Sequence, residues 1–329
     1  MEIYPGAHLI ECEVGGRPLY LPLLIGETEA LLLDCGTRSH AAEDIPKYLA
    51  KVGLLKDRLT FVLITHPDTD HSGGAGEMVR RYPHLRLLCG AADRRLIESP
   101  DYLFSFRYDH YRQDHEMYYD DKTSAAMRDS CSGPQRVFLG LTGGETLDLG
   151  ATRLLDVIHL PGHSHGHLGV YDRDHRTLFY GDAIQGRGYR SLKGEWVLCP
   201  TYLYVDAYLQ TIRRIEHLGA ERIVGCHWPV WRGEHEIREF CASSRNFVEA
   251  ADRLINDYLA RHLAGATLRE LCQSLGGKLG EWPAPMHTEL SFPFLGHLER
   301  GVSQGSFSVD RSTRPVIYRR GWCLTQSSA

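Results

Sequence analysis

Residues 65–74 read THPDTDHSGG and follow the apolar run FVLI at 61–64. Four side chains able to bind metal therefore fall within six residues, directly after a predicted buried strand: His66, Asp68, Asp70 and His71. Neighbouring side chains diverge on a tight loop, so the first two can hold one ion while the last two hold a second. The alternative is a helix start capped by Asp70, with both histidines at the surface.

Three later segments each place one more ligand-type residue directly after a predicted strand. They are His163 after 153–160, Asp182 after 177–180, and His227 after 222–225. Together with the first loop, they make four imidazoles and three carboxylates. Two metal ions need this number of ligands if one carboxylate bridges them and positions stay open for water. The four segments together therefore predict a two-metal site.

Apolar runs typical of strands alternate with helical patterns over the first two thirds of the chain. Further strands are predicted at 19–25, 30–33, 85–89 and 168–171, and helices at 41–52, after Gly73-Gly74, and over the segment carrying Tyr208, Ile212 and Ile215. This alternation predicts a layered α/β domain with helices outside the sheets. In such folds the ligand-carrying loops gather at the C-terminal ends of the strands, where all seven candidates lie.

Two segments lie outside this pattern. Residues 93–135 are rich in aromatic, histidine and charged residues, and we interpret them as a lid inserted into the catalytic domain, 1–235. In the C-terminal domain, 236–329, the sequence predicts three helices followed by a strand pair, which is the layout of a winged helix. The predicted helices are 236–263, 268–275 and 290–300, and the strands are 306–309 and 316–319.

The composition argues against a protein that binds nucleic acid, spans a membrane or depends on disulfides. The chain has 329 residues, is 43% hydrophobic, and carries a formal net charge of −5, which argues against nucleic acid as a partner. No apolar run reaches the roughly 18 residues of a membrane span, and the start lacks a signal segment. Nine scattered cysteines without a CxxC pair indicate reduced thiols in a cytoplasmic protein. None of them has an obvious His or Asp partner, so no cysteine nucleophile is expected.

The residues from His66 to His227 resemble the metallo-β-lactamase superfamily, whose signature is HxHxDH, then a His, a bridging Asp and a final His. The resemblance covers roughly residues 5–230 and implies a four-layer αββα sandwich with the metals at one edge. It also implies a role for each ligand: His66, Asp68 and His163 at the first metal, Asp70, His71 and His227 at the second, and Asp182 as the bridge. Asp34 lies in a DCGT turn similar to the family's DTG turn, and is expected to support the ligand loops from behind.

One departure from the family pattern is Asp68, which stands where the second histidine is usual and makes the loop HxDxDH. A carboxylate is a harder ligand than imidazole and adds negative charge to the first site. We therefore expect two divalent transition-metal ions, zinc in the first place, with iron or manganese as alternatives. Replacing Asp68 by His would restore the common loop and move the preference towards zinc.

The expected activity is hydrolysis of an ester, thioester or lactone by a hydroxide that bridges the two metals, with Asp70 and Asp182 as catalytic residues. The partner of the protein would be a small-molecule substrate.

One alternative function is that of a non-haem di-iron protein that reduces or senses oxygen, supported by Asp68 and the likeness of its loop to the HxExDH loop of flavodiiron proteins. Another is a metal-dependent nuclease, supported by the late arginines. The C-terminal domain is expected to cover the pocket or to form a homodimer.

Several residues near the predicted ligands are candidates for shaping the site or lining the substrate pocket. His159, His165 and His167 crowd the third ligand, and the resemblance gives the position of His167 a role in shaping the site without binding metal. Four aromatic residues that follow Asp182 are candidates for lining the substrate pocket: Tyr189, Trp196, Tyr202 and Tyr204. The sequence does not identify the substrate.

Overall fold

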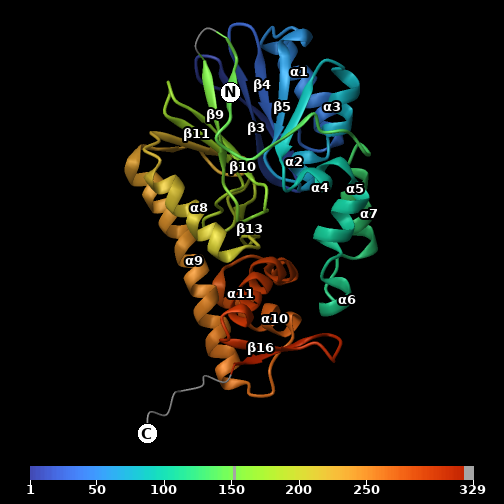
Figure 1. The fold of residues 1–329 in the computed structure, drawn as a ribbon, viewed down its shortest axis with the longest axis vertical. Helices are drawn as coiled ribbons and strands as arrows, with labels where there is room; N and C mark the ends of the chain where they lie inside the picture. The colour runs from blue at the N-terminus through green and yellow to red at the C-terminus, as the bar shows by residue number, and fades with distance from the viewer. Residues whose placement is uncertain (151–152, 322–329) are drawn as a thin grey trace.

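Two large β-sheets packed face to face form the centre of the computed structural model, which describes residues 1–150 and 153–321 (Figure 1). The first sheet has seven strands in sequential order: β1 (Glu2–Tyr4), β2 (Ala7–Val14), β3 (Arg17–Ile25), β4 (Ala30–Leu33), β5 (Leu59–Ile64), β6 (Arg86–Gly90) and β7 (Leu139–Leu141). The second has the order β15-β14-β11-β10-β9-β8. Its strands are β8 (Thr146–Asp148), β9 (Leu154–His159), β10 (Leu168–Asp172), β11 (Thr177–Gly181), β14 (Arg222–Gly225) and β15 (Trp231–Arg232).

The central strands are apolar at nearly every position because both of their faces are buried. In β4, Leu31 and Leu33 pack in the core between the two sheets, whereas Ala30 and Leu32 pack in the core beneath the outer helices. Side chains alternate across a strand, so a strand covered on both faces needs apolar residues throughout. In β11 the same alternation sends Phe179 between the sheets and Leu178 towards the helices of the other side.

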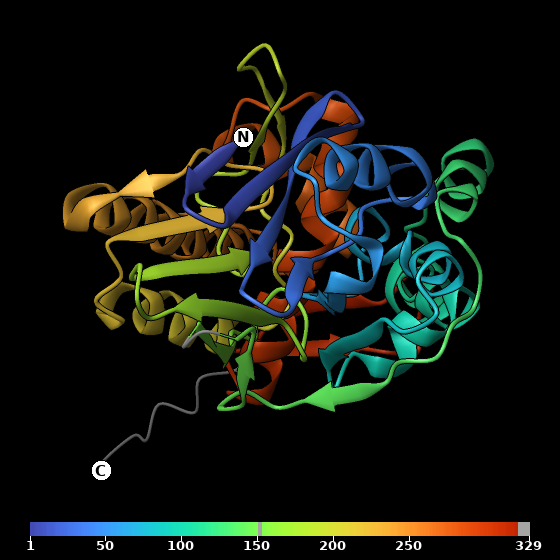
Figure 2. The ribbon, with the colours of Figure 1, turned by 90° about the horizontal axis from the view of Figure 1, so that it is seen from above.

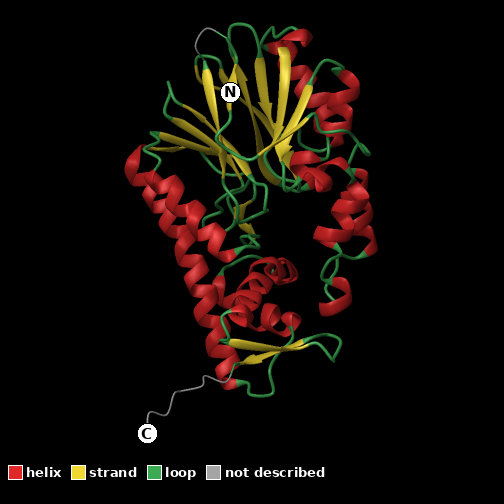
Figure 3. Cartoon of the chain, viewed as in Figure 1, coloured by secondary structure: helices red, strands yellow, loops and turns green. Residues whose placement is uncertain are grey.

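Helices cover the outer face of each sheet, so the predicted αββα sandwich is confirmed (Figures 2 and 3). The first sheet is covered by η1 (His40–Asp44), α1 (Ile45–Lys51) and α3 (Ala75–Arg81). The short helix η2 (Lys56–Arg58) leads into β5, and α2 (Thr69–Ser72) forms part of the ligand loop. The second sheet is covered by α8 (Val205–His217) and α9 (Gly233–Arg261). A hairpin of β12 (Tyr189–Arg190) and β13 (Trp196–Leu198) lies between β11 and α8 in sequence.

The predicted helix 41–52 begins one residue earlier, with a π-helical turn at η1. The helix-cap interpretation of the ligand loop is wrong, because the residue that precedes α2 is Asp68, not Asp70, and its side chain makes no capping hydrogen bond.

None of the described helices is both long enough and apolar enough to cross a membrane. The cysteines that the structure describes are all free.

The 93–135 segment folds into short helices that face the C-terminal part of the chain (Figure 1). These are α4 (Arg94–Glu98), α5 (Pro100–Leu103), η3 (Phe104–Tyr108), α6 (Arg112–His115) and α7 (Asp121–Asp129). Tyr111 meets Phe292 edge to face, with their ring centroids 5.2 Å apart, and Asp114 forms an ion pair with Arg314. The segment therefore contacts the C-terminal part of the chain through both a helix residue and a loop residue.

The C-terminal part has the predicted order of helix, helix, helix and hairpin. After α9 come α10 (Leu268–Leu279), η4 (Ala284–Leu290), α11 (Ser291–Ser303), β16 (Phe307–Asp310) and β17 (Ile317–Arg320). The predicted helix 290–300 is thus α11, preceded by a 3₁₀ helix across the proline-rich break. Thr267 and Glu270 form a capping box at the start of α10, which fixes where this helix begins.

Helix α9 crosses the domain boundary predicted at 235/236. Near its start, Phe240 packs against Trp228 and Tyr180 of the sandwich, at centroid distances of 6.1 Å. Ser244 accepts a hydrogen bond from Gly186 N at 2.9 Å. Nearer its end, Asp252 binds His297 of α11. The first half of this helix therefore belongs to the sandwich core and the second half carries the C-terminal helices.

A chain that ends after residue 235 should fold poorly, because it uncovers the apolar face that Phe240 and its neighbours bury. We expect insoluble protein or a Tm at least about 10 °C below that of the full chain, since several kcal/mol of core packing is lost. Expression followed by thermal unfolding monitored by circular dichroism measures this. A soluble fragment with the Tm of the full chain would show that the boundary at 235 separates independent units.

Candidate metal centre

The four ligand-bearing loops meet at one edge of the sandwich because their strands run in the same direction. In the second sheet, β9 and β14 both run parallel to β11, since β10 is antiparallel to its two neighbours and β14 is parallel to β11. His163, Asp182 and His227 therefore leave the sheet at one edge. In the first sheet β5 delivers His66, and α2 continues the loop to His71. All seven predicted ligands are brought together.

Three of the predicted ligands form a first cluster. Asp68 Oδ2 lies 2.9 Å from His163 Nε2 and 3.6 Å from His66 Nε2. Ligand atoms about 2.0–2.2 Å from one tetrahedral ion lie roughly 3.3–3.6 Å apart, so these separations are close to what a single ion requires. Both imidazoles are fully buried.

A second cluster lies beside the first. His71 Nε2 is 3.2 Å from His227 Nε2, and Asp70 Oδ2 is 3.5 Å from His227 Nε2. Asp182 extends towards the same pair, with Oδ1 3.8 Å from His71 Nε2 and Oδ2 3.6 Å from His227 Nε2. Rings of His66 and His71 lie 4.0 Å apart between centroids, so the two clusters adjoin.

Two buried atoms at the centre of these clusters have no hydrogen-bond partner within the described part of the chain: His66 Nε2 and Asp182 Oδ1. Burying a polar atom without a partner costs free energy, and such atoms are rare in folded proteins. An imidazole nitrogen and a carboxylate oxygen are also the donors that divalent transition metals bind. The side chains at this site therefore fit metal ions.

The other nitrogen of each histidine is tied to the surrounding structure, which turns Nε2 towards the centre. His71 Nδ1 donates to Asp34 Oδ2 at 2.9 Å, and His227 Nδ1 donates to Pro18 O at 2.7 Å. His163 Nδ1 lies 3.1 Å from Thr201 O, and His66 Nδ1 lies 2.9 Å from Thr65 Oγ1. Such hydrogen bonds orient imidazole ligands and strengthen their binding.

Asp34 holds both ends of the first ligand loop, and Cys226 Sγ of the last ligand loop donates to its Oδ2 at 3.5 Å. Besides His71, its carboxylate accepts from Thr65 N at 2.7 Å and from Thr65 Oγ1 at 2.8 Å. Asp34 itself adopts a left-handed conformation with φ of 60°. A non-glycine residue is seldom found there, and such backbone strain persists only where the surroundings impose it.

Charges within the site divide the histidines into two kinds. Burial and the neighbouring His71 lower the pKa of His66 well below its ordinary value, so His66 is neutral. Burial acts in the same direction on His71, but the carboxylates of Asp182 and Asp34 prevail and raise the pKa of His71 well above its ordinary value. Without metal, the protonated His71 balances the carboxylates, and a metal ion would take over that role.

The structure also shows residues that sequence reasoning missed. Arg107, from η3, donates from Nε and Nη2 to the two oxygens of Asp68, and only 6% of its surface is exposed. Tyr108 OH donates to Asp68 Oδ1 at 3.0 Å. Burial alone would raise the pKa of Asp68, but the Arg107 cation lowers it well below its usual range. Nothing in the run YLFSFRYDHY singles out these two residues, because their role depends on a contact across 39 positions.

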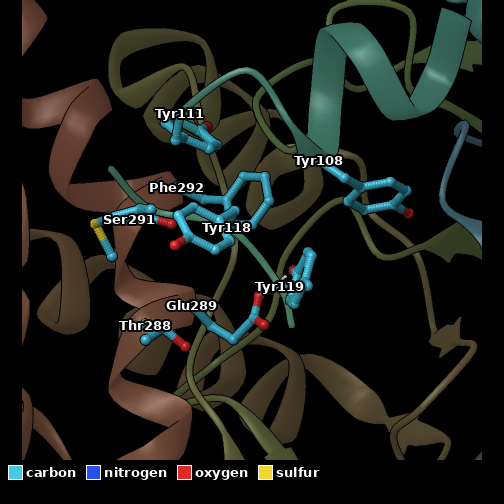
Figure 4. Close-up of a pocket in the computed structure, with 9 residues that line it drawn as sticks. Tyr108, Tyr111, Tyr118, Tyr119, Thr288, Glu289, Ser291 and Phe292 are labelled. Carbon is cyan, nitrogen blue, oxygen red and sulfur yellow. Dashed lines mark hydrogen bonds between the residues drawn. The ribbon is translucent and has the colours of Figure 1, made fainter. Parts of the chain in front are cut away.

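A cavity of about 840 Å³ opens over both clusters. Asp68, Asp70, Asp182 and His227 lie at its base. Its walls come from the 93–135 segment and from η4 and α11, and include Tyr108, Tyr119, Lys122, Met127, Met286, Glu289 and Phe292. Figure 4 shows Tyr119 pointing towards Glu289, and its hydroxyl donates to Glu289 Oε2 at 2.9 Å. Burial raises the pKa of Glu289 to about 7.

Of the aromatic residues proposed for the pocket, only Tyr189 lies in this cavity, where its hydroxyl donates to Asp182 Oδ2 at 2.9 Å. Trp196 lines a separate cavity of about 310 Å³ beside Trp228 and Phe240. Tyr202 is fully buried and bonds His297, so its assignment to the pocket is wrong. Tyr204 stacks on His165.

Two further histidines and two cysteines near the site have structural roles. His167 accepts a hydrogen bond from Asp182 N at 3.2 Å and stacks on His66 at 5.0 Å between centroids, so it shapes the site from behind. His159 bonds His165 O, outside both clusters. Burial raises the pKa of the Cys35 and Cys226 thiols, which disfavours the thiolate that a nucleophile needs.

Comparison with known proteins places this geometry in a family. A family model described as the metallo-beta-lactamase superfamily matches residues 22–227. The acyl-coenzyme A thioesterase MBLAC2 of Homo sapiens is 25% identical over 262 residues, which cover 75% of this chain and 85% of that protein. The hydroxyacylglutathione hydrolase of Aeromonas salmonicida is 28% identical over 169 residues, covering 51% of this chain and 48% of that protein.

Solved structures share the fold over nearly the whole chain. A metallo-beta-lactamase family protein of Thermus thermophilus superposes with a TM-score of 0.72 at 24% identity, covering 97% of this chain and 99% of that one. A beta-lactamase domain protein of Burkholderia ambifaria gives 0.74 at 18% identity, covering 98% and 93%. At these identities the likeness concerns the fold alone, and it extends through the C-terminal helices.

The role of Asp34 can be tested through metal affinity. Asp34→Asn should lower zinc affinity by about 10–100-fold, because an amide orients His71 less firmly than a carboxylate does. Competition titration with a zinc chelator measures the change, and Asp57→Asn, at an exposed residue on η2, is the matched control. A folded Asp34→Asn protein with unchanged zinc affinity would contradict this role.

Proposed function

The chain belongs to the metallo-β-lactamase superfamily, and from that membership and its site we propose that it is a binuclear metal-dependent hydrolase of thioesters. The observation that carries the proposal is the convergence of seven ligand-type side chains, two of which have buried atoms with no hydrogen-bond partner among the residues described. The named relatives narrow the substrate class, because acyl-coenzyme A and hydroxyacylglutathione are both thioesters.

We assign the ligands as the family pattern orders them. His66, Asp68 and His163 would hold the first ion, and Asp70, His71 and His227 the second. Asp182, which reaches the second cluster through both oxygens, would bridge the two ions. Two divalent ions at this site, which we propose to be zinc, would acidify a shared water so that hydroxide is available near neutral pH.

The chain's own residues prepare the site for a thioester. Tyr189 OH holds Asp182 Oδ2, and the Arg17 guanidinium lies 3.4 Å from Asp70 Oδ2, so both catalytic carboxylates keep fixed directions. Tyr108 and Phe292 give the cavity apolar walls that suit an acyl group and exclude water. Lys122 supplies positive charge in the same cavity, which suits an anionic thiol as the leaving group.

The nuclease alternative has less support in the structure than in the sequence. Three of the late arginines that motivated it are paired with acidic residues of the chain itself. Arg300 pairs with Asp206 and Asp252, Arg314 with Asp114, and Arg319 with Asp310. A phosphate backbone would have to compete with these carboxylates. The di-iron alternative depends on Asp68 alone, and metal analysis of the purified protein separates it from a zinc enzyme.

Metal content provides the first test of the proposal. The purified protein should contain close to two zinc ions per chain by elemental mass spectrometry, and Asp68→Ala should leave about one, because only the first cluster loses a ligand. Chelation should abolish turnover, and added zinc should restore it. Full activity in protein shown to be free of metal would end the proposal.

Turnover provides the second test. Asp182→Asn should lower kcat/KM for an acyl-coenzyme A by at least about 100-fold with an unchanged circular dichroism spectrum, because a neutral amide balances two dications poorly. The assay follows thiol release from acyl-coenzyme A and acyl-glutathione, with a lactone and a phosphodiester in parallel. Asp206→Asn, on the outer helix α8, is the matched control. Wild-type turnover by Asp182→Asn, or turnover by the native chain confined to the phosphodiester, would refute the assignment.

A further inference from the structure

Asp68 introduces a charge that the common form of this site lacks. The family pattern has a neutral imidazole at this position, whereas a carboxylate carries one negative charge into a buried cluster. Burying a charge is costly unless it is paired and hydrogen-bonded. The surroundings of Asp68 must therefore supply a positive charge and hydrogen-bond donors, which a neutral histidine at this position does not need.

Arg107 supplies that counter-charge in a two-point contact. Its Nε and Nη2 meet the two oxygens of Asp68, which is the parallel fork that guanidinium and carboxylate form in their strongest pairs. Its Nη1 lies 3.3 Å from His163 O, and its Nη2 lies 3.3 Å from His163 Nε2. The guanidinium therefore packs against two of the three residues of the first cluster.

Neighbouring residues hold the contact between Arg107 and Asp68 in place. Arg107 belongs to the π-helical turn η3, and the next residue, Tyr108, donates to Asp68 Oδ1 while its oxygen accepts from Thr69 N. On the other side, the Arg107 guanidinium lies 5.6 Å from the centre of the Phe292 ring. Figure 4 shows Tyr108 and Phe292 beside a smaller pocket, which Tyr118 and Tyr119 also line. Asp68 Oδ1 is thus doubly held, and Oδ2 lies nearest His163 and His66.

We propose that Asp68 and Arg107 act as one unit that replaces the usual histidine, with Arg107 as a positioning residue for the first metal. The pair has no net charge, as a neutral imidazole has none, and its hydrogen bonds fix the carboxylate with Oδ2 towards the cluster. This inference rests on the proposed metal centre. It also means that Asp68 no longer favours iron or manganese by its charge, since Arg107 cancels it.

The proposal changes what Asp68→His should do. The sequence alone predicts that a histidine restores the common loop. In the structure, the same change leaves the buried Arg107 without a partner and places its charge beside a dication. Zinc binding should therefore tolerate Asp68→His only when Arg107→Met is made in the same chain.

The test compares the native chain with Asp68→His, Arg107→Met and the double variant. First-site zinc affinity is measured by competition titration, and Tm is measured with and without zinc. Asp68→His should lower first-site affinity at least about 10-fold through the uncompensated cation, and the double variant should return to within about threefold of the native chain. In metal-free protein, each single variant should lower Tm by about 4 °C or more, and the double variant by less than their sum.

A further readout separates positioning from packing. Zinc should close most of the Tm gap of Arg107→Met, because the ion then neutralises Asp68, whereas a loss of packing would persist in zinc. Arg107→Lys, which keeps the charge, should lie between Arg107→Met and the native chain. Arg112→Met, at an exposed arginine of the same segment, is the matched control and should leave every readout unchanged.

The outcomes also distinguish this inference from the proposed function. If the native chain binds two ions and Asp68→His binds two with unchanged affinity and Tm, the pairing is refuted while the hydrolase proposal stands. If the native chain binds no metal, the hydrolase proposal fails, and Arg107 has no metal to position. A double variant no better than Asp68→His alone would also overturn the pairing.

Discussion

The site depends on the orientation of four buried imidazole rings. Each ring must turn Nε2 inward, and a free side chain would rotate away, so each Nδ1 is bound to a group that the fold holds still. Three of these partners, Asp34, Thr201 O and Pro18 O, come from segments far from their histidine in sequence. The sandwich must therefore form before the rings can be aligned, because it brings these partners together.

The strand ends that carry the ligands are rigid for the same reason that the sandwich is stable. Leu63 of β5 and Phe179 of β11 pack in the core between the sheets, and the ligands follow within a few residues. A side chain that starts from a strand buried on both faces has little freedom left. The candidate ligands are thus held in fixed positions, although four separate loops supply them.

The cavity above the ligands belongs to other parts of the chain. Arg107 and Tyr108 come from the 93–135 segment, and Glu289 and Phe292 come from the C-terminal helices. The contact of Tyr119 with Glu289 joins these two parts across the cavity. The walls of the cavity and the counter-charge of Asp68 therefore come from segments that lie outside the ligand motifs.

Local patterns in the sequence were enough to predict a layered α/β fold and the set of seven candidate ligands, and the resemblance to a known family implied the αββα arrangement. An apolar strand that ends in a cluster of His and Asp residues can be recognised without knowing its neighbours, and the order of four such ends is specific. The residues that accompany the ligands could be identified only from the folded structure. Arg107 meets Asp68 across 39 positions and Tyr119 meets Glu289 across 170, and no periodicity encodes such contacts. For the same reason Tyr202 looked like a pocket residue, whereas packing against α8 and α11 buries it.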